Sequence, residues 1–208
     1  MPPGRPREFD PDKALEAALL LFWRHGYEGT SLAALTRAMR INMPSLYAAF
    51  GNKEQLFKKA LDRYLQKPAS YLPMALKEPT VAAVIEKLFA GAIHMTMNAR
   101  HPDGCLLVQG ALVSGPDAAS IQKELSRRRA GALALVRKRF ERGQAEGDLP
   151  AHVNAGKLAR FIVTLIWGLS VQAAGGATRT ELEEVVDVAM RGWGTLIADT
   201  GNRPGKSS

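Results

Sequence analysis

Apolar residues recur along the whole chain with the three- and four-residue spacing of amphipathic helices. The spacing is clearest in residues 15–22, 81–93, 158–169 and 182–193. We find no segment with the alternation of apolar and polar residues that predicts a β-strand, and no internal repeat. The pattern therefore predicts an all-α fold of about nine helices.

Capping signals divide the first third of the chain into four helices. Polar residues that accept hydrogen bonds from free backbone N–H groups precede the apolar stretches at Asp10, Ser31, Asn42 and Asn52. Gly26 follows the first stretch and predicts its end. The second and third helices are short and separated by a tight turn, which is typical of a helix-turn-helix.

The helix after Asn42 has two unlike faces. Leu46 and Phe50 are four residues apart, so both are expected to face the rest of the domain. Residues 43–45 then lie on the exposed side, where they are expected to enter a major groove of DNA. Tyr47 and Lys53 are expected to contact phosphates, since Lys53 lies beside free N–H groups at the start of the next helix.

The charge of the chain also favours a polyanionic partner for its N-terminal part. The 208 residues hold 28 Lys and Arg against 20 Asp and Glu, a formal net charge of +8. The first 67 residues carry 11 basic and 7 acidic side chains, and the other 141 carry 17 and 13. The N-terminal third is therefore about twice as densely positive, which favours association with nucleic acid.

Other classes of protein find little support in the composition. One cysteine, Cys105, excludes an intrachain disulfide and a cysteine-rich zinc site, so we expect a reducing cytoplasm and no metal or cofactor. The N-terminus lacks the apolar core of a secretory signal. The apolar run of residues 161–174 is short for a membrane span and is expected to form a buried or interface helix.

Residues 9–64 resemble the DNA-binding region of the TetR family of transcriptional regulators. The resemblance rests on ordered features, namely His25-Gly26-Tyr27, Thr30-Ser31, Ser45-Leu46-Tyr47, Phe50, Lys53, Glu54 and Leu56. It implies an N-terminal three-helix domain with a helix-turn-helix at residues 1–66. It also implies a larger C-terminal helical bundle for ligand binding and dimerisation at residues 67–200, followed by a disordered tail at 201–208.

The same resemblance implies a homodimeric, cytoplasmic repressor that leaves a double-stranded DNA operator when a small-molecule effector binds. Thr30, Ser31, Tyr47 and Lys53 would contact phosphates, residues 42–45 would lie at base edges, and an N-terminal arm would reach the minor groove. The expected DNA-binding residues are Arg5, Arg7, Thr30, Ser31, Arg40, Asn42, Met43, Pro44, Ser45, Tyr47 and Lys53.

Four positions depart from the pattern common in the family. Arg40 stands where many members have glycine, so we expect either a left-handed residue at a cost of about 1 kcal/mol, a different turn, or a phosphate contact. Ala48-Ala49 replaces an aromatic residue and a histidine, which removes possible backbone contacts. Met43 replaces a frequent basic residue, which favours apolar contact with thymine methyl groups.

The C-terminal part is expected to hold the effector between its middle helices. A plain core position is the favoured interpretation of each candidate lining residue, and the candidates are Phe89, Ile93, Met97, Cys105, Val136, Phe140, Phe161 and Trp167. Met95 and Met97 would give an adaptable wall. Because these faces carry little charge, a mostly apolar or aromatic effector is expected. The broad apolar stripes of the last two helices predict the dimer surface.

Several alternatives remain open at this stage. Cys105 lies in a Gly104-Cys105-Leu106 context similar to that of TetR-like electrophile sensors, but a small buried residue that packs like alanine is the favoured interpretation. His101 with Cys105 is the only pair that suggests an enzyme, and no nucleophile or metal motif accompanies it. An activator or a non-specific architectural DNA binder also fits. Arg127, Arg128 and Arg129 are expected to form a solvated helix face.

Overall fold

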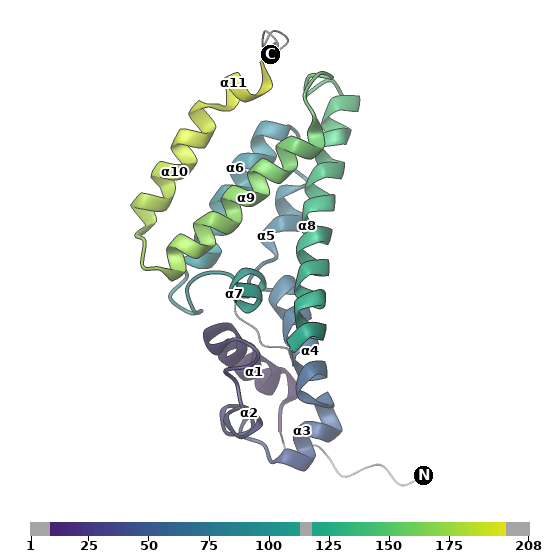
Figure 1. The fold of residues 1–208 in the computed structure, drawn as a ribbon, viewed down its shortest axis with the longest axis vertical. Helices are drawn as coiled ribbons and strands as arrows, with labels where there is room; N and C mark the ends of the chain where they lie inside the picture. The colour runs from purple at the N-terminus through teal and green to yellow at the C-terminus, as the bar shows by residue number, and fades with distance from the viewer. Residues whose placement is uncertain (1–8, 113–117, 199–208) are drawn as a thin grey trace, which may run out of the picture.

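The computed structural model describes residues 9–112 and 118–198, which fold into α-helices connected by short segments (Figure 1). The helices are α1 (Pro11–His25), α2 (Leu32–Met39), α3 (Met43–Phe50), α4 (Lys53–Gln66), α5 (Tyr71–Ala75), α6 (Val81–Thr96), α7 (Leu106–Leu112), α8 (Ala119–Ala145), α9 (Ala155–Ala174), α10 (Arg179–Arg191) and α11 (Trp193–Ile197). No strand occurs in these two ranges. Two of these eleven helices, α5 and α11, have only 5 residues each, and nine longer helices remain in the described residues. The expected all-α fold of about nine helices is confirmed.

The predicted caps act at the predicted residues. The Asp10 carboxylate accepts a hydrogen bond from the Asp12 N–H at 2.9 Å, and the Ser31 hydroxyl accepts one from the Ala34 N–H at 3.1 Å. Asn52 forms a capping box with Gln55 at the start of α4. Gly26 ends α1 at a φ of 71°, a conformation that costs glycine little. Local chemistry therefore fixes the ends of the first four helices.

The first four helices form a compact head around an aromatic core. The rings of Phe22 in α1 and Phe57 in α4 meet edge to face, with their centroids 5.0 Å apart. Tyr27 packs against both rings. Arg63 of α4 also forms ion pairs with Asp12 and Glu16 of α1. The α1–α4 contact thus combines apolar packing with charge pairing.

The remaining helices form a bundle whose core lies between α6, α8 and α9. Its buried residues include the whole predicted stripe of α6, which comprises Val81, Val84, Ile85, Leu88, Phe89, Ala92 and Ile93. The core of the head continues into the end of this bundle through Leu106 and Leu107 of α7 and Leu125 of α8. Figure 1 shows α4 reaching from the head to the lower end of α8. The head is therefore packed directly on the bundle.

The expectation of a solvated face at Arg127, Arg128 and Arg129 is wrong for two of the three. Arg128 lies between Asp62 of α4 and Glu124 of α8, with a nitrogen–oxygen distance of 2.6 Å to each. Arg129 donates to the Leu107 carbonyl at 2.6 Å. Hydrogen bonds from the arginines lower the pKa of Glu124 to about 2. Because α8 packs on α4 and α7 at this point, the arginines connect the bundle to the head.

The segment of residues 67–79 contains three prolines, yet the structure places the short helix α5 within it. Its Pro73 lies in the first helical turn, where a missing N–H breaks no intrahelical hydrogen bond. The N-terminal arm with Arg5 and Arg7 and the tail at 201–208 lie outside the described residues, as does the Ser114-Gly115-Pro116-Asp117 sequence, which is typical of a turn before a helix.

Helix α9 contains the apolar run noted in the sequence. Within the described ranges it is the one helix whose length and composition match those of a membrane span. It packs against α6 and α8, and Ala159, Ile162 and Leu169 are buried in the bundle core. Its opposite face carries Phe161, which is 40% exposed although it was assigned to the apolar stripe.

Replacing Phe57 by alanine tests the aromatic core of the head. The side chain is fully buried, so its loss removes buried apolar area and leaves a cavity. We expect Phe57→Ala to lower the free energy of unfolding by about 3–5 kcal/mol in urea denaturation. Leu135→Ala on the exposed surface of α8 is the control, with an expected change below about 0.5 kcal/mol. Equal effects of the two substitutions would contradict this packing.

Candidate nucleic-acid interface and ligand pocket

Helix α3 lies at one end of the molecule (Figure 1). Leu46 and Phe50 are buried against the head, as their spacing predicts. Pro44 is exposed, and the Tyr47 side chain is 47% exposed. The helix is therefore fixed on its apolar side and free on the side predicted to meet DNA.

The start of α3 is held by its cap. The Asn42 side chain accepts a hydrogen bond from the Ser45 N–H at 2.8 Å. Pro44 falls in the first turn, where it breaks no hydrogen bond of the helix. The ring of Phe9, just before α1, packs against Phe50 at a centroid distance of 6.3 Å. The residues predicted to face base edges thus belong to a well-defined helix end.

The turn between α2 and α3 depends on a left-handed arginine. Arg40 has φ 55° and ψ 43°, and its N–H donates to the Arg37 carbonyl at 3.2 Å. Of the alternatives expected at this position, the structure has the left-handed residue. A cleft of about 410 Å³ beside the turn is lined by Arg37, Arg40 and Asn42, among others. Such a set of donors suits a phosphate group.

Arg37 was not among the residues predicted from the sequence to contact DNA. It lies in the last turn of α2 and faces the same cleft as Arg40. Its position three residues before the turn is the signal that would have identified it, since residues three apart share one face of a helix.

Lys53 is held in place by an aromatic ring. Its Nζ lies 4.4 Å from the centroid of Tyr27, a distance typical of a cation–π interaction. Partial burial lowers the pKa of Lys53, and the nearby Glu28 opposes this shift. The ammonium group is therefore positioned at the start of α4 before any DNA is bound.

The structure does not support a phosphate contact for Thr30. Its side chain is 1% exposed, and its hydroxyl donates to the Gly26 carbonyl at 2.7 Å. This hydrogen bond supplies a donor to a carbonyl at the C-terminal end of α1, and it stabilises the loop that follows the helix. Ser31 remains exposed and caps α2.

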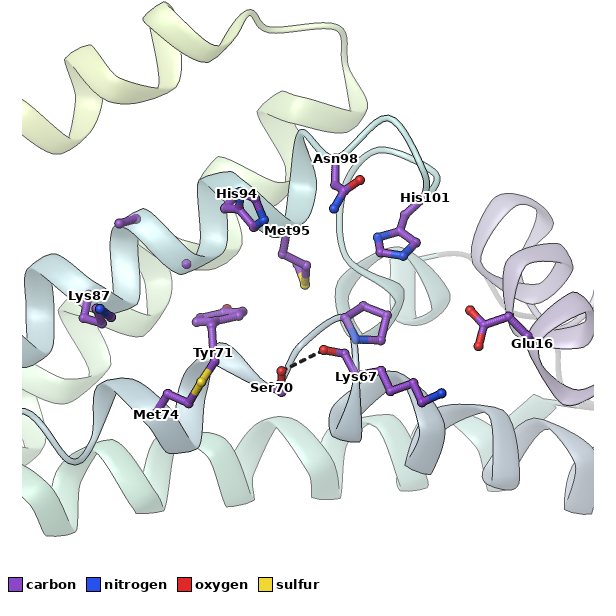
Figure 2. Close-up of a pocket in the computed structure, with 13 residues that line it drawn as sticks. Glu16, Lys67, Ser70, Tyr71, Met74, Lys87, His94, Met95, Asn98 and His101 are labelled. Carbon is purple, nitrogen blue, oxygen red and sulfur yellow. Dashed lines mark hydrogen bonds between the residues drawn. The ribbon is translucent and has the colours of Figure 1, made fainter. Parts of the chain in front are cut away.

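A pocket of about 770 Å³ opens between the head and the bundle. Its walls come from the end of α4, from α5, from the second half of α6 and from the segment after α6 (Figure 2). Glu16 contributes a wall from α1 in the head. The lining is mixed, with the apolar side chains of Tyr71, Met74 and Met95 and the polar side chains of Lys67, Lys87, His94, Asn98 and His101.

None of the eight residues predicted to bind the ligand lines this pocket. Four of them, Phe89, Ile93, Val136 and Phe140, are buried in the bundle core, and Met97 and Trp167 pack against that core. Phe161 lines a separate cleft of about 390 Å³ with His152 and Lys157. The pocket instead uses Met95, which had been expected to form an adaptable wall.

Cys105 lies in the core that joins head and bundle. Its side chain is buried, and the Tyr64 hydroxyl lies 3.1 Å from its Sγ and 3.1 Å from the Sδ of Met95. Burial raises the pKa of the Cys105 thiol, although the hydrogen bond with Tyr64 opposes this shift. His101 stacks on Trp23 at a centroid distance of 5.4 Å. The suspected His101–Cys105 pair is therefore engaged with other partners.

The family models agree with this division of the chain. A model described as "Bacterial regulatory proteins, tetR family" matches residues 14–60, which include α2 and α3. A second, "Tetracyclin repressor-like, C-terminal domain", matches residues 82–188, about half of the chain. The chain belongs to the TetR family. The resemblance seen in residues 9–64 is thereby confirmed.

Relatives of this TetR-family protein are similar along nearly its whole length. The HTH-type transcriptional repressor ComR of Escherichia coli K12 is 35% identical over 196 residues, which cover 93% of either chain. The HTH-type transcriptional repressor BdcR of the same strain is 31% identical and covers 86% of this chain and 87% of its own. Similarity of this extent includes the bundle as well as the head.

Solved structures that share the fold of this TetR-family protein include a complex with DNA. A cysteine mutant of the TetR family regulator CifR, in complex with 26-bp double-strand operator DNA, has a TM-score of 0.86 and 43% identity. It covers 91% of this chain and all of its own. The reduced form of Escherichia coli NemR has a TM-score of 0.72 at 19% identity, which concerns the fold alone.

The pH dependence of stability tests the environment of Cys105. Its pKa is raised in the folded protein, so above about pH 8.5 the unfolded chain loses the thiol proton first and unfolding is favoured. We expect the unfolding free energy of the wild type to fall more than that of Cys105→Ala between about pH 7.5 and 9.5. Parallel pH profiles, or thiol alkylation as fast as in free cysteine, would contradict the buried thiol.

Proposed function

We propose that this TetR-family protein is a homodimeric repressor in the cytoplasm that binds an operator through α3 and leaves it when a small molecule occupies the bundle. The observation that carries the proposal is the capped, outward helix α3, whose inner residues Leu46 and Phe50 are buried. A relative with 43% identity is known in complex with operator DNA, which supports the same use of this surface.

The proposed DNA contacts divide by chemistry. Met43, Pro44 and Ser45 at the start of α3 face the bases in the major groove. Groups that donate hydrogen bonds or carry positive charge face phosphates, and they are Ser31, Arg37, Arg40, Tyr47 and Lys53. Arg5 and Arg7 would form an arm in the minor groove.

The proposed dimer joins α9 and α10 of two chains. The outer faces of these helices carry exposed apolar side chains, namely Phe161, Val171, Val185 and Val188, of which Val188 is 65% exposed. Gly168 has no atom within 4 Å of the place where a Cβ would lie, so another helix has room to approach. In Figure 1, α10 forms an outer edge of the bundle. A two-fold contact here would place two α3 helices in successive major grooves.

The proposed release of DNA starts in the pocket between head and bundle. Glu16 of α1 lines this pocket and pairs with Arg63 of α4. His101 lines it as well and stacks on Trp23 of α1. An effector that binds better to a state with α1 displaced would shift the population away from the DNA-binding arrangement. Tight binding without this preference would not release DNA.

The other candidate functions are less well supported. The thiol of Cys105 is buried with a raised pKa, which does not favour an electrophile sensor. We infer that the protein is a regulator and not an enzyme, since its family and its relatives ComR, BdcR and CifR are transcriptional regulators. An architectural DNA binder would bind the duplex upstream of its own gene and a random duplex equally at every salt concentration.

Substitution of Lys53 tests the proposed phosphate contact. We expect Lys53→Gln to weaken binding to the upstream duplex about tenfold at low salt, because one charge-assisted hydrogen bond is lost. The slope of log affinity against log salt concentration should fall by about one. Lys138→Gln on α8 removes the same charge far from the head and should change neither value. An unchanged slope for Lys53→Gln would remove this residue from the interface.

Sedimentation tests the proposed dimer. We expect the wild type to be dimeric and Val188→Asp to raise its dissociation constant roughly a hundredfold or more, because an unpaired charge would be buried. Leu135→Asp places the same charge on an exposed apolar position of α8 and should leave the dimer intact. Dissociation by Leu135→Asp alone would indicate that the interface lies on α8. A monomeric wild type would exclude the proposed dimer.

A further inference from the structure

The pocket between head and bundle carries three charged side chains, and they are not equivalent. The negative charge of Glu16 is already matched, because its Oε2 pairs with Arg63 Nε at 2.5 Å. Lys87 has a distant partner, with its Nζ 3.8 Å from Glu78 Oε1. Lys67 forms no ion pair with any residue that the structure describes. The charge left uncompensated in the pocket is therefore positive and lies at the Lys67 end.

Two further polar groups, from the segment after α6, lie across the same end of the pocket from Lys67 (Figure 2). The Oδ1 of Asn98 accepts the Arg100 N–H at 3.0 Å, which leaves its Nδ2 as a donor. The Nδ1 of His101 is buried and has no hydrogen-bond partner among the described residues. Buried polar atoms are normally paired, so this nitrogen has the capacity to bind a ligand.

The other end of the pocket holds an aromatic ring and two thioethers, next to Lys87 and His94 (Figure 2). Gly91 allows the Tyr71 ring to lie against α6, since a Cβ at position 91 would come within 2.6 Å of Tyr71. Met74 and Met95 flank this ring (Figure 2). Thioether and aromatic surfaces adapt to flat organic ligands.

From this arrangement we infer that the pocket binds a small organic carboxylate, with its acid group at Lys67, Asn98 and His101 and its apolar body over Tyr71 and Met95. This inference rests on the proposed function insofar as it takes the pocket as the effector site. It replaces the mostly apolar effector expected from the sequence, because the pocket lies at the polar junction with the head and not inside the bundle core. Binding of the acid group next to Glu16 and His101 would act directly on α1.

Three probes with one aromatic body and different charges test the inference. Naphthylacetate, naphthylacetamide and naphthylethylamine supply an anionic, a neutral and a cationic head, and calorimetry with the full-length protein without DNA measures their affinities. We expect naphthylacetate to bind about fivefold more tightly than the amide, which is the effect of one partly exposed ion pair. The amine should bind most weakly.

Two matched lysine variants locate the acid group. Lys67→Gln should abolish the preference for naphthylacetate over the amide and leave the affinity for the amide unchanged. Lys87→Gln removes the same charge at the other end of the pocket and should preserve the preference. Loss of the preference in Lys87→Gln alone, equal binding of all three probes by the wild type, or no binding of any probe at millimolar concentration would overturn the inference.

Binding to the upstream duplex is measured separately on the same proteins. Since the calorimetry contains no DNA, a protein that prefers naphthylacetate but does not bind the duplex would contradict the proposed repressor and not the pocket. A protein that binds the duplex specifically but shows no anion preference would contradict the pocket and not the repressor.

Discussion

The contact between α1 and α4 is the constraint on which the rest of the structure depends. It joins the aromatic pair Phe22–Phe57 with the ion pairs of Arg63, so that apolar packing and charge fix the same two helices. Helix α4 is also tied to α8 through Asp62 and Arg128. A single helix thus belongs to both the head and the bundle, and the direction in which α3 faces follows from it.

Local features were predictable from the sequence because they depend on neighbouring residues. The caps at Asp10 and Asn52 follow from hydrogen bonding within one turn. The left-handed Arg40 was one of three alternatives, and it came from the glycine that many family members have at this position. The buried face of α6 follows from helical periodicity. The predicted division at residues 66 and 67 stays a prediction, although the core of the head extends into α7 and α8.

Features that depend on how helices meet were not predictable. Thr30 looks like an exposed cap residue, yet its hydroxyl is used inside the loop after α1. Phe161 belongs to an apolar stripe but lies on the outer face of α9. The pocket combines Glu16 with residues 67–101, and no periodicity relates positions so far apart. Its location beside α1 gives a short physical route from a bound molecule to the head, through Glu16 and the stacked rings of His101 and Trp23.

The central claim is that two outward α3 helices, held at a fixed separation, read the bases of one operator. In vitro selection from random duplexes with the wild type and with Met43→Arg tests it most directly. We expect an inverted repeat with half-sites about one helical turn, or a multiple of it, apart, and a change toward guanine at one symmetric position in both halves for Met43→Arg. Selection of no motif by the wild type, or of the same motif by both proteins, would contradict the account.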